Sequence, residues 1–402
     1  MKWLLTTLVL CVFPLAVNSV GDDDWPQFRG RNRDGIANAI SEIKPWPKAG
    51  PRLAWQVNIG EGFSGISVSG DRIFTMFADG KSEFLASFEL ASGKEVWRVK
   101  VDEMLKNQHG NGPRSTPAVD EQNAYGLSSR GHLVAVEKKT GKLQWEAFCK
   151  KDFRSDGPGH GFSSSPLVEE NMLLLQTEAG NGKALVAFNK RSGQILWTTG
   201  YGGDGYCSPT SFVFDGERQF LFVASEKAAA LSAAGKTLWE KRAGPGLIAM
   251  PLFIAPDKIF ILGSGETNGM LMKIAKMQNN FAVEEVWSNN QLRDSFGSPV
   301  LYKDHLYGCS GAFLVCIDLA TGTRKWTQRG FGEGSVILAG GYLIIMGGKG
   351  NLAVAQATPE KYLEIGSFQA LRGKCWTAPT IAQGKLLLRN HVEMVCYDLA
   401  AR

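Results

Sequence analysis

The chain has 402 residues, of which 44% are hydrophobic and 21% are charged, so a disordered or fibrous protein is excluded. Its 47 glycines against 16 prolines favour a fold with many tight turns and few long helices. Because 44 basic residues are balanced by 39 acidic ones, the net charge of +5 does not favour nucleic-acid binding.

Residues 1–21 are predicted to be a cleaved signal peptide. Lys2 precedes an apolar run, and small residues follow it. Lipid modification of Cys11 is not expected, because Leu10 stands where that modification requires a small residue. No later apolar run reaches the roughly 18 residues that span a bilayer. We therefore expect a periplasmic or secreted protein with no membrane span.

Tryptophan reveals an internal repeat in the rest of the chain. Seven of the 11 tryptophans follow one another at intervals of 39 to 52 residues: Trp55, Trp97, Trp145, Trp197, Trp239, Trp287 and Trp326. A glycine stands four residues before five of them, at Gly93, Gly141, Gly193, Gly235 and Gly322. A small residue stands ten residues before the same five, at Ser87, Ala135, Ala187, Ala229 and Cys316. The glycines are typical of turns between strands.

Each repeat unit is predicted to contain four short strands. The first begins at a proline, as in Ser164-Ser-Pro166, where the missing N–H is tolerated. Four-stranded units of about 40–50 residues with no helical stretch are typical of β-propeller blades. We expect the tryptophan side chains to lie between neighbouring blades, each close to a small residue. The fold class is therefore all-β, with four-stranded antiparallel blades.

The two ends of the chain are predicted to share one blade. Trp55 comes too early to complete a unit, whereas Thr377–Leu399 supplies three strands and then ends. We therefore expect Arg52–Asn58 to add the last strand and close the ring. This organisation gives a signal peptide (1–21), an N-terminal strap (22–50) and one propeller domain (51–402).

The number of blades depends on the unit after Trp326. Ser335 replaces its leading proline, and Phe368 is expected at the position of its tryptophan. If this degenerate unit forms a blade, the propeller has eight blades. Seven blades would follow if it were an insertion. We predict eight.

The repeat resembles that of a known family. Ala135-Val-Glu-Lys-Lys-Thr-Gly-Lys-Leu-Gln-Trp145 and its echo from Cys316 to Trp326 resemble the tryptophan-docking repeat of quinoprotein-type propellers. That family includes the pyrroloquinoline-quinone (PQQ) dehydrogenases and the BamB-type outer-membrane assembly proteins. The opening Trp25-Pro-Gln-Phe-Arg-Gly-Arg-Asn-Arg-Asp-Gly35 is similar to exported bacterial PQQ-like repeat proteins. The resemblance implies a propeller fold more strongly than any one activity.

Two functions follow from the resemblance. We favour an exported, non-catalytic and monomeric propeller that serves as a binding or scaffold module for a protein or cell-envelope component. The alternative is an oxidoreductase that uses PQQ and calcium to act on alcohols or sugars. Many dehydrogenases of the family have adjacent cysteines, calcium ligands and a catalytic Asp, and none of these can be mapped onto this sequence. We therefore expect no catalytic residue, no metal and no cofactor.

The loops between successive blades are expected to meet at one mouth of the central channel. They are rich in glycine and polar residues, and most contain an arginine. One interpretation is a mildly basic funnel for an acidic small molecule, a sugar or an anionic peptide, with Tyr206, Phe296 and Trp376 as stacking groups. The candidate ligand-binding residues are Arg114, His160, Asp204, Tyr206, Arg293 and Trp376. The structural alternative is that the arginines cap carbonyls or pair with Asp156, Asp204, Asp294 and Glu333.

Other motifs favour structural roles. Six cysteines follow the signal peptide, at Cys149, Cys207, Cys309, Cys316, Cys375 and Cys396, and their spacing specifies no disulfide pairing. Cys316 and Cys396 occupy matching repeat positions and are predicted to be small core residues. The register of the predicted hairpin does not place Cys309 opposite Cys316. The five histidines lack metal-binding spacing. Gly60–Gly65 matches G-x-G-x-x-G but has no strand-to-helix context, so no dinucleotide site is expected.

Overall fold

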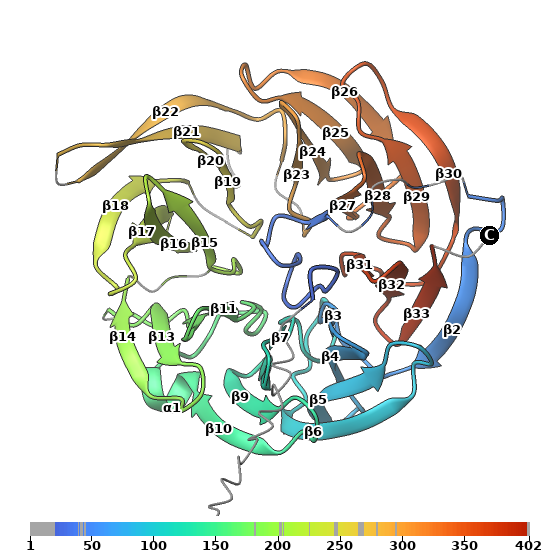
Figure 1. The fold of residues 1–402 in the computed structure, drawn as a ribbon, viewed down its shortest axis with the longest axis horizontal. Helices are drawn as coiled ribbons and strands as arrows, with labels where there is room; N and C mark the ends of the chain where they lie inside the picture. The colour runs from blue at the N-terminus through green and yellow to red at the C-terminus, as the bar shows by residue number, and fades with distance from the viewer. Residues whose placement is uncertain are drawn as a thin grey trace, which may run out of the picture.

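Eight β-sheets form a closed ring in the described part of the chain, as the computed structural model in Figure 1 shows. Each sheet is one blade, and its strands follow one another from the centre to the perimeter. The structure describes residues 21–38, 40, 43, 46–180, 182–200, 203, 205–224, 226–244, 248–263, 269–278, 280–293 and 296–399. Apart from Gly21, the predicted signal peptide lies outside these residues. The eight-bladed prediction is confirmed, and the seven-bladed alternative is wrong.

The first four blades follow one another in chain order. Blade 1 contains β3 (Ser67–Ser69), β4 (Arg72–Ala78), β5 (Ser82–Glu89) and β6 (Glu95–Glu103). Blade 2 contains β7 (Ala118–Val119), β8 (Asn123–Leu127), β9 (His132–Glu137) and β10 (Leu143–Phe148). Blade 3 contains β11 (Leu167–Glu169), β12 (Met172–Gln176), β13 (Leu185–Asn189) and β14 (Ile195–Thr199). Blade 4 contains β15 (Thr210–Phe214), β16 (Glu217–Ala224), β17 (Lys227–Leu231) and β18 (Thr237–Arg242).

The remaining blades complete the ring. Blade 5 contains β19 (Leu252–Ile254), β20 (Lys258–Leu262), β21 (Gly269–Lys276) and β22 (Phe281–Asn289). Blade 6 contains β23 (Val300–Tyr302), β24 (His305–Ser310), β25 (Phe313–Asp318) and β26 (Arg324–Arg329). Blade 7 contains β27 (Ser335–Ala339), β28 (Tyr342–Met346), β29 (Asn351–Gln356) and β30 (Leu363–Gln369). Blade 8 contains β31 (Thr380–Ala382), β32 (Lys385–Arg389), β33 (Glu393–Asp398) and β2 (Arg52–Asn58). A short helix, α1 (Cys149–Phe153), follows β10, and β1 (Ile36–Ala37) pairs with β27.

Burial explains the strand sequences. The second strand of a blade is covered on both faces by its neighbours and is a continuous apolar run, as in β12 and β28. The outer strands are partly exposed and alternate between apolar and polar residues, as in β6. The core is therefore divided among the interfaces between blades.

The last blade contains strands from both ends of the chain. β2 pairs antiparallel with β33, and this pairing places Trp55 opposite Cys396. Arg52 and Asp398 add an ion pair at 2.6 Å. The predicted closure by Arg52–Asn58 is therefore confirmed, with the same bounds.

The repeated tryptophans contact the blade that follows in the chain. Six indole N–H groups donate to carbonyls of that blade: Trp55 to Leu90 (2.9 Å), Trp97 to Lys138 (3.1 Å), Trp145 to Lys190 (3.0 Å), Trp197 to Ala233 (2.9 Å), Trp287 to Leu319 (2.8 Å) and Trp326 to Thr358 (2.9 Å). Trp239 differs, because it donates to the Gln219 side chain of its own blade at 3.0 Å. It pairs with Ala230, the neighbour of the predicted Ala229.

The turn glycines are required because the rings lie directly against them. A Cβ atom at Gly93 would lie 2.7 Å from the Trp55 ring, and one at Gly193 would lie 2.6 Å from the Trp145 ring. Both glycines also have φ near +70°, a conformation that disfavours other residues. These two turns therefore require glycine for two reasons: a Cβ atom would overlap the indole ring, and the backbone has a positive φ.

The position of Phe368 was predicted wrongly. In each described blade, a β-bulge interrupts the outer strand one residue before the tryptophan position. In blade 7 this register places Gly366 there, and Phe368 lies two residues farther along. Trp46 from the N-terminal strap covers Gly366, where a Cβ atom would lie 3.2 Å from the Trp46 Cβ. The ring of Trp46 packs edge-on against Phe368 with centroids 6.0 Å apart. An indole from the strap therefore fills the place left by the glycine.

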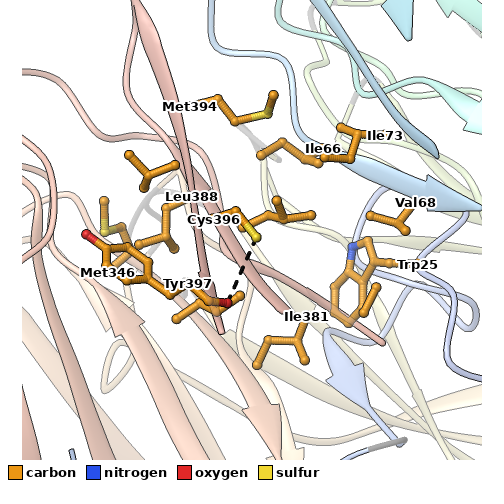
Figure 2. Close-up of a cluster of buried hydrophobic side chains, with 14 of the residues drawn as sticks. Trp25, Ile66, Val68, Ile73, Met346, Ile381, Leu388, Met394, Cys396 and Tyr397 are labelled. Carbon is orange, nitrogen blue, oxygen red and sulfur yellow. Dashed lines mark hydrogen bonds between the residues drawn. The ribbon is translucent and has the colours of Figure 1, made fainter. Parts of the chain in front are cut away.

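The beginning of the strap lies in the centre of the ring, where Figure 1 shows the blue segment. Trp25 forms a bridge with Val68 of blade 1, and the Pro26 carbonyl accepts from Val119 of blade 2 at 2.8 Å. β1 extends blade 7 through parallel pairing with β27. Figure 2 shows Trp25 beside Val68 and Ile381 in a buried cluster that joins the strap to blades 1 and 8. The strap thus holds several blades together.

All six described cysteines are buried, and none of them forms a disulfide with another described cysteine. Cys316 and Cys396 pair with Trp326 and Trp55, which confirms their prediction as small core residues. Cys309 pairs with Leu314 rather than with Cys316, as the predicted register requires.

Candidate functional site

The channel funnel is a cavity of about 450 Å³ at the centre of the face where the connections between blades meet. Its walls come from the segments that precede the first strands of the blades, as expected for a channel mouth. The described residues that line it and bear on its chemistry are Trp25, Phe28, Arg29, Phe63, His109, Arg114, His160, Tyr206, Phe296, Ser335 and Trp376. Loops distant in sequence therefore meet in one site that contains several aromatic side chains.

One side of the channel funnel is an aromatic triad of Phe63, Phe296 and Trp376. Trp376 stacks on Phe63 with ring centroids 5.3 Å apart, and the Phe296 centroid lies 4.9 Å from that of Trp376. The hydroxyl of Thr377 donates to the Phe63 carbonyl at 3.1 Å and so ties blade 8 to blade 1. Phe296 is 43% exposed. The triad presents a large apolar surface to the opening.

The opposite side combines two histidines with a tyrosine. The rings of His109 and His160 meet edge-to-face at 4.5 Å, and the Tyr206 ring lies 6.0 Å from that of His160. The backbone N–H of His160 donates to the Tyr206 hydroxyl at 3.2 Å. Lys374 donates to the His109 carbonyl at 2.8 Å and lies 4.9 Å from the Trp376 centroid, so it links the two sides.

The floor is made by the N-terminal strap. Trp25 and Phe28 face the cavity from below, next to the guanidinium of Arg29. Arg29 donates to the carbonyls of Ser298 (3.0 Å) and Pro299 (2.6 Å), which begin blade 6. Burial lowers the pKa of Arg29 to about 10, so its guanidinium remains charged at neutral pH. The backbone carbonyls of blade 6 stabilise this charge.

The arginines of the mouth loops do not form the basic funnel that we considered. Arg114 lines the cavity, but it donates to the carbonyls of Gly110 (2.8 Å) and Gly112 in its own loop. Burial lowers the pKa of Arg114. Arg293 is exposed and is not among the lining residues. Arg114 therefore caps backbone carbonyls, as the structural alternative predicted.

Some of the other predicted site residues line the channel funnel, and others do not. His160, Tyr206 and Trp376 are brought together in the channel funnel. Asp204 lies outside the described residues, as does Asp294. Asp156 pairs with Lys150 at 3.3 Å rather than with an arginine.

Sequence reasoning missed Phe63 and the floor. Phe63 belongs to the G-x-G-x-x-G stretch, which forms no helix and instead leads into blade 1. The alternation of Gly60, Gly62 and Gly65 with larger residues indicates only a tight loop. The opening motif around Trp25 resembles the same segment of related proteins. No local feature of its sequence predicts that it lies at the channel axis.

The PQQ and calcium alternative can be tested against the donor groups of the cavity. None of the described lining residues is Asp or Glu. Nowhere in the described ranges do three or more His, Cys, Asp or Glu side chains gather so that they could hold a metal ion. Calcium is bound by oxygen ligands, among which carboxylates are prominent. The residues present in the described lining therefore do not fit calcium-bound PQQ.

A second cavity lies beside the channel funnel and shares two of its walls. Its volume is about 880 Å³, and both Phe63 and Trp376 line it. Its other described walls include Glu61, Glu333 and Lys349. The stacked pair of Phe63 and Trp376 thus separates two neighbouring hollows on one face, and a bound segment could contact both of its sides.

Within the described ranges, no helix combines the length and the apolar character needed to cross a membrane.

The comparisons with known proteins agree with this architecture. The family model described as "Outer membrane protein assembly factor BamB" matches residues 81–328. A protein of that name from Shewanella oneidensis is 23% identical over 356 residues, which cover 84% of this chain and 76% of that protein. Its namesake from Xanthomonas campestris is 30% identical over 105 residues, 25% of either chain.

Solved structures show the same fold. BamB from Moraxella catarrhalis has a TM-score of 0.62 at 15% identity, covering 88% of this chain and 99% of that one. A quinohemoprotein alcohol dehydrogenase from Comamonas testosteroni has a TM-score of 0.66 at 11% identity, covering 94% of this chain and 81% of that one. At such identities the likeness concerns the fold alone.

Proposed function

The chain belongs to the family of outer membrane protein assembly factor BamB, and on this basis we propose that it is an exported, non-catalytic propeller that binds another protein during the assembly of outer-membrane proteins. Its relatives carry that description, and the predicted signal peptide is consistent with a periplasmic location. We further propose that it works as a monomer without a cofactor.

The aromatic triad is the observation that carries this proposal. Phe63, Phe296 and Trp376 form a preassembled apolar surface at an open cavity. Buried aromatic side chains contribute most of the binding energy in many protein interfaces. The two arginines of the described lining, Arg29 and Arg114, already donate to carbonyls of the protein. The chemistry of the funnel therefore suits contact with an apolar side chain of a partner.

The proposed partner places one aliphatic or aromatic side chain in the channel funnel. The cavity of about 450 Å³ has room for such a group above the floor formed by Trp25 and Phe28. The adjoining cavity would take the flanking backbone of the same partner, because Trp376 lines both. A loop or chain end of another protein meets these requirements.

Complementation tests the proposal. Cells that lack the protein receive the wild-type chain, a Phe296→Ser/Trp376→Ser variant, or a Phe313→Ser control. Phe313 is 39% exposed in β25 and is not a lining residue of the funnel. We expect the wild type and the control to restore folded outer-membrane barrels, as measured by heat-modifiable migration, and the double variant to fail while melting near the wild-type temperature.

Two results would contradict the proposal. If loss of the protein leaves outer-membrane barrels unchanged, the role in assembly is wrong. If the double variant restores them fully, the channel funnel is not the binding site. Dye reduction by the purified protein with PQQ, calcium and an alcohol or sugar would contradict its non-catalytic nature.

A further inference from the structure

Nine of the described residues that line the channel funnel carry a hydroxyl group, and Ser335 differs from the rest. Eight of these hydroxyls form a hydrogen bond within the protein: those of Thr116, Ser163, Ser165, Tyr206, Ser208, Ser298, Thr377 and Thr380. The hydroxyl of Ser335 has no hydrogen-bond partner among the described residues, although the residue is only 4% exposed. Because a buried donor without a partner costs free energy, a ligand that accepts from Ser335 would recover it.

The repeat does not impose this unpartnered hydroxyl. Ser335 lies four residues before the end of β27, just as Ser298 lies four residues before the end of β23. It therefore has the position of Ser298 and not, as the sequence suggested, that of the leading proline. The hydroxyl of Ser298 accepts from the N–H of Met250, which precedes blade 5, at 2.9 Å. The described part of the chain supplies no such donor to Ser335.

A second unpartnered donor lies in the floor of the channel funnel. The Nη atoms of Arg29 donate to the carbonyls of Ser298, Pro299 and Asp34, but its Nε–H has no partner among the described residues. Arg29 is 3% exposed, and these contacts include no ion pair. Asp34 attracts the positive charge, but it is not a described lining residue of the funnel. Buried charges are usually paired, so the funnel has a cation that lacks an anion.

The two unpartnered donors adjoin the same segment of blade 6. A Cβ atom at Gly297 would lie 3.4 Å from the Cβ of Ser335, and the next residue, Ser298, accepts from Arg29 at 3.0 Å. Both side chains line the same cavity of about 450 Å³. They are the only two side chains of the described lining with a buried donor that lacks a partner. An N–H, an O–H and a positive charge are therefore available in one place.

We propose that a small monovalent anion, such as chloride, binds in the channel funnel to the Nε–H of Arg29 and the hydroxyl of Ser335. An anion accepts from both donors, and one negative charge balances the one unpaired cation. A dianion would need further donors, and the described lining leaves no other buried side-chain donor unpartnered. The site does not use the aromatic triad, so it goes beyond the proposed function and does not depend on it.

Thermal unfolding of the purified protein tests the site. Sodium chloride or sodium bromide replaces sodium gluconate at constant ionic strength, so that general screening of charges stays the same. A ligand that binds only the folded protein raises the melting temperature with a dependence on its concentration that the binding equation describes. We expect both halides to do so for the wild type, and sulfate to bind no more tightly than chloride.

Ser335→Ala is the test variant and Ser87→Ala is its matched control. Ser335→Ala removes a hydroxyl with no described partner, so in gluconate it should melt at or above the wild-type temperature. Its dissociation constant for chloride should rise about tenfold or more, because a hydrogen bond to a charged group is lost. Ser87 in β5 is also buried and unpartnered, but it does not line the funnel, and blade 2 has Ala135 at the same position. The control should keep the wild-type affinity.

Crystals soaked in bromide give the position of the ion by anomalous scattering. We expect a peak within hydrogen-bonding distance of Arg29 Nε and Ser335 Oγ in the wild type, and none there in Ser335→Ala. Bromide found only at the protein surface would be an adventitious ion only and would overturn the proposal.

Three further results would also overturn it: no halide effect on the melting temperature, equal loss of affinity in the two serine variants, or tighter binding of sulfate than of chloride. The complementation experiment with the Phe296→Ser/Trp376→Ser variant does not measure anion binding. Failure of the anion site together with success of that experiment would therefore reject this inference and leave the proposed function standing.

Discussion

The guanidinium of Arg389 donates to the hydroxyl of Thr75 at 2.8 Å, although the two residues are 314 positions apart. Arg389 ends β32 in blade 8, and Thr75 lies in β4 of blade 1. The same guanidinium also donates to the carbonyls of Ser64, Met76 and Gly62 at 2.9–3.1 Å. The interface between the last and first blades is thus closed by one buried cation that bonds mainly to backbone oxygens.

Replacing Arg389 with Met should therefore weaken the ring. The buried acceptors of blade 1 would lose their donors, and we expect the free energy of unfolding to fall by about 3–5 kcal/mol. Arg329→Met is the matched control, because Arg329 is exposed and should cost less than about 0.5 kcal/mol. Urea unfolding measures both. Equal stability of the two variants would show that Arg389 does not close the ring.

The contact between Trp145 and Gly193 can be separated from backbone strain. Gly193 and Gly216 have φ of 71° and 75°, but only Gly193 faces a ring, and nothing lies within 4 Å of a Cβ atom at Gly216. Gly216→Ala should cost about 1–2 kcal/mol from φ alone. Gly193→Ala should cost about 1–3 kcal/mol more, because the new methyl group overlaps the indole. Equal unfolding free energies in urea would contradict the packing of Trp145 on this turn.

The six cysteines should be unreactive in the folded protein. Burial raises the pKa of Cys309, Cys316, Cys375 and Cys396 to about 12, so almost no thiolate exists at pH 8. We expect a thiol reagent to modify none of the six rapidly at pH 8, and all six after unfolding in guanidinium without reductant. Fewer than six reactive thiols after unfolding would reveal a disulfide and contradict the structure.

Glu83 gives a stability effect that depends on pH. Its carboxylate is fully buried and accepts from the backbone and hydroxyl of Ser129 and from the backbone of Leu105, yet burial raises its pKa above the ordinary value of a glutamate. The nearby charge of Asp102 acts in the same direction. Because the folded state holds this proton more tightly than the unfolded state, stability from Glu83 is present at low pH. It is lost as pH rises through the folded pKa.

The comparison with Glu83→Gln isolates this effect. The variant does not titrate at this position, so the free energy of unfolding of the wild type should fall relative to that of the variant as pH rises from the ordinary glutamate range through the raised pKa of Glu83. Urea unfolding at several pH values gives the difference directly. A difference that is constant or has the opposite slope would contradict the raised pKa.

The parts of the fold that the sequence predicts are those with local causes. Turn glycines such as Gly93 and the periodic tryptophans lie within single repeat units, so their spacing predicts the blades. The closing strand Arg52–Asn58 follows from counting strands, because an incomplete unit at one end complements one at the other. Phe368 was misplaced since its register depends on a β-bulge, which residue spacing does not reveal.

The site was harder to predict because its contacts are distant in sequence. The loop positions of His160, Tyr206 and Trp376 could be inferred from blade topology, and the structure places them in one cavity. The recurrence of arginine in those loops suggested a basic surface, but whether a guanidinium meets its own loop carbonyls, as that of Arg114 does, depends on the folded backbone. The contact of Arg29 with Ser298 joins residues 269 positions apart and has no local pattern.

The position of the strap changes how the propeller should lose its structure. Modular arrays with contacts only between neighbours can unravel one module at a time. Here Arg33 donates to Pro166 of blade 3, Arg29 donates to Ser298 of blade 6, and β1 joins blade 7, so a single segment couples non-adjacent modules. Detaching any one of these modules disturbs the shared segment and thereby the others, which favours an all-or-none transition over gradual fraying of the array.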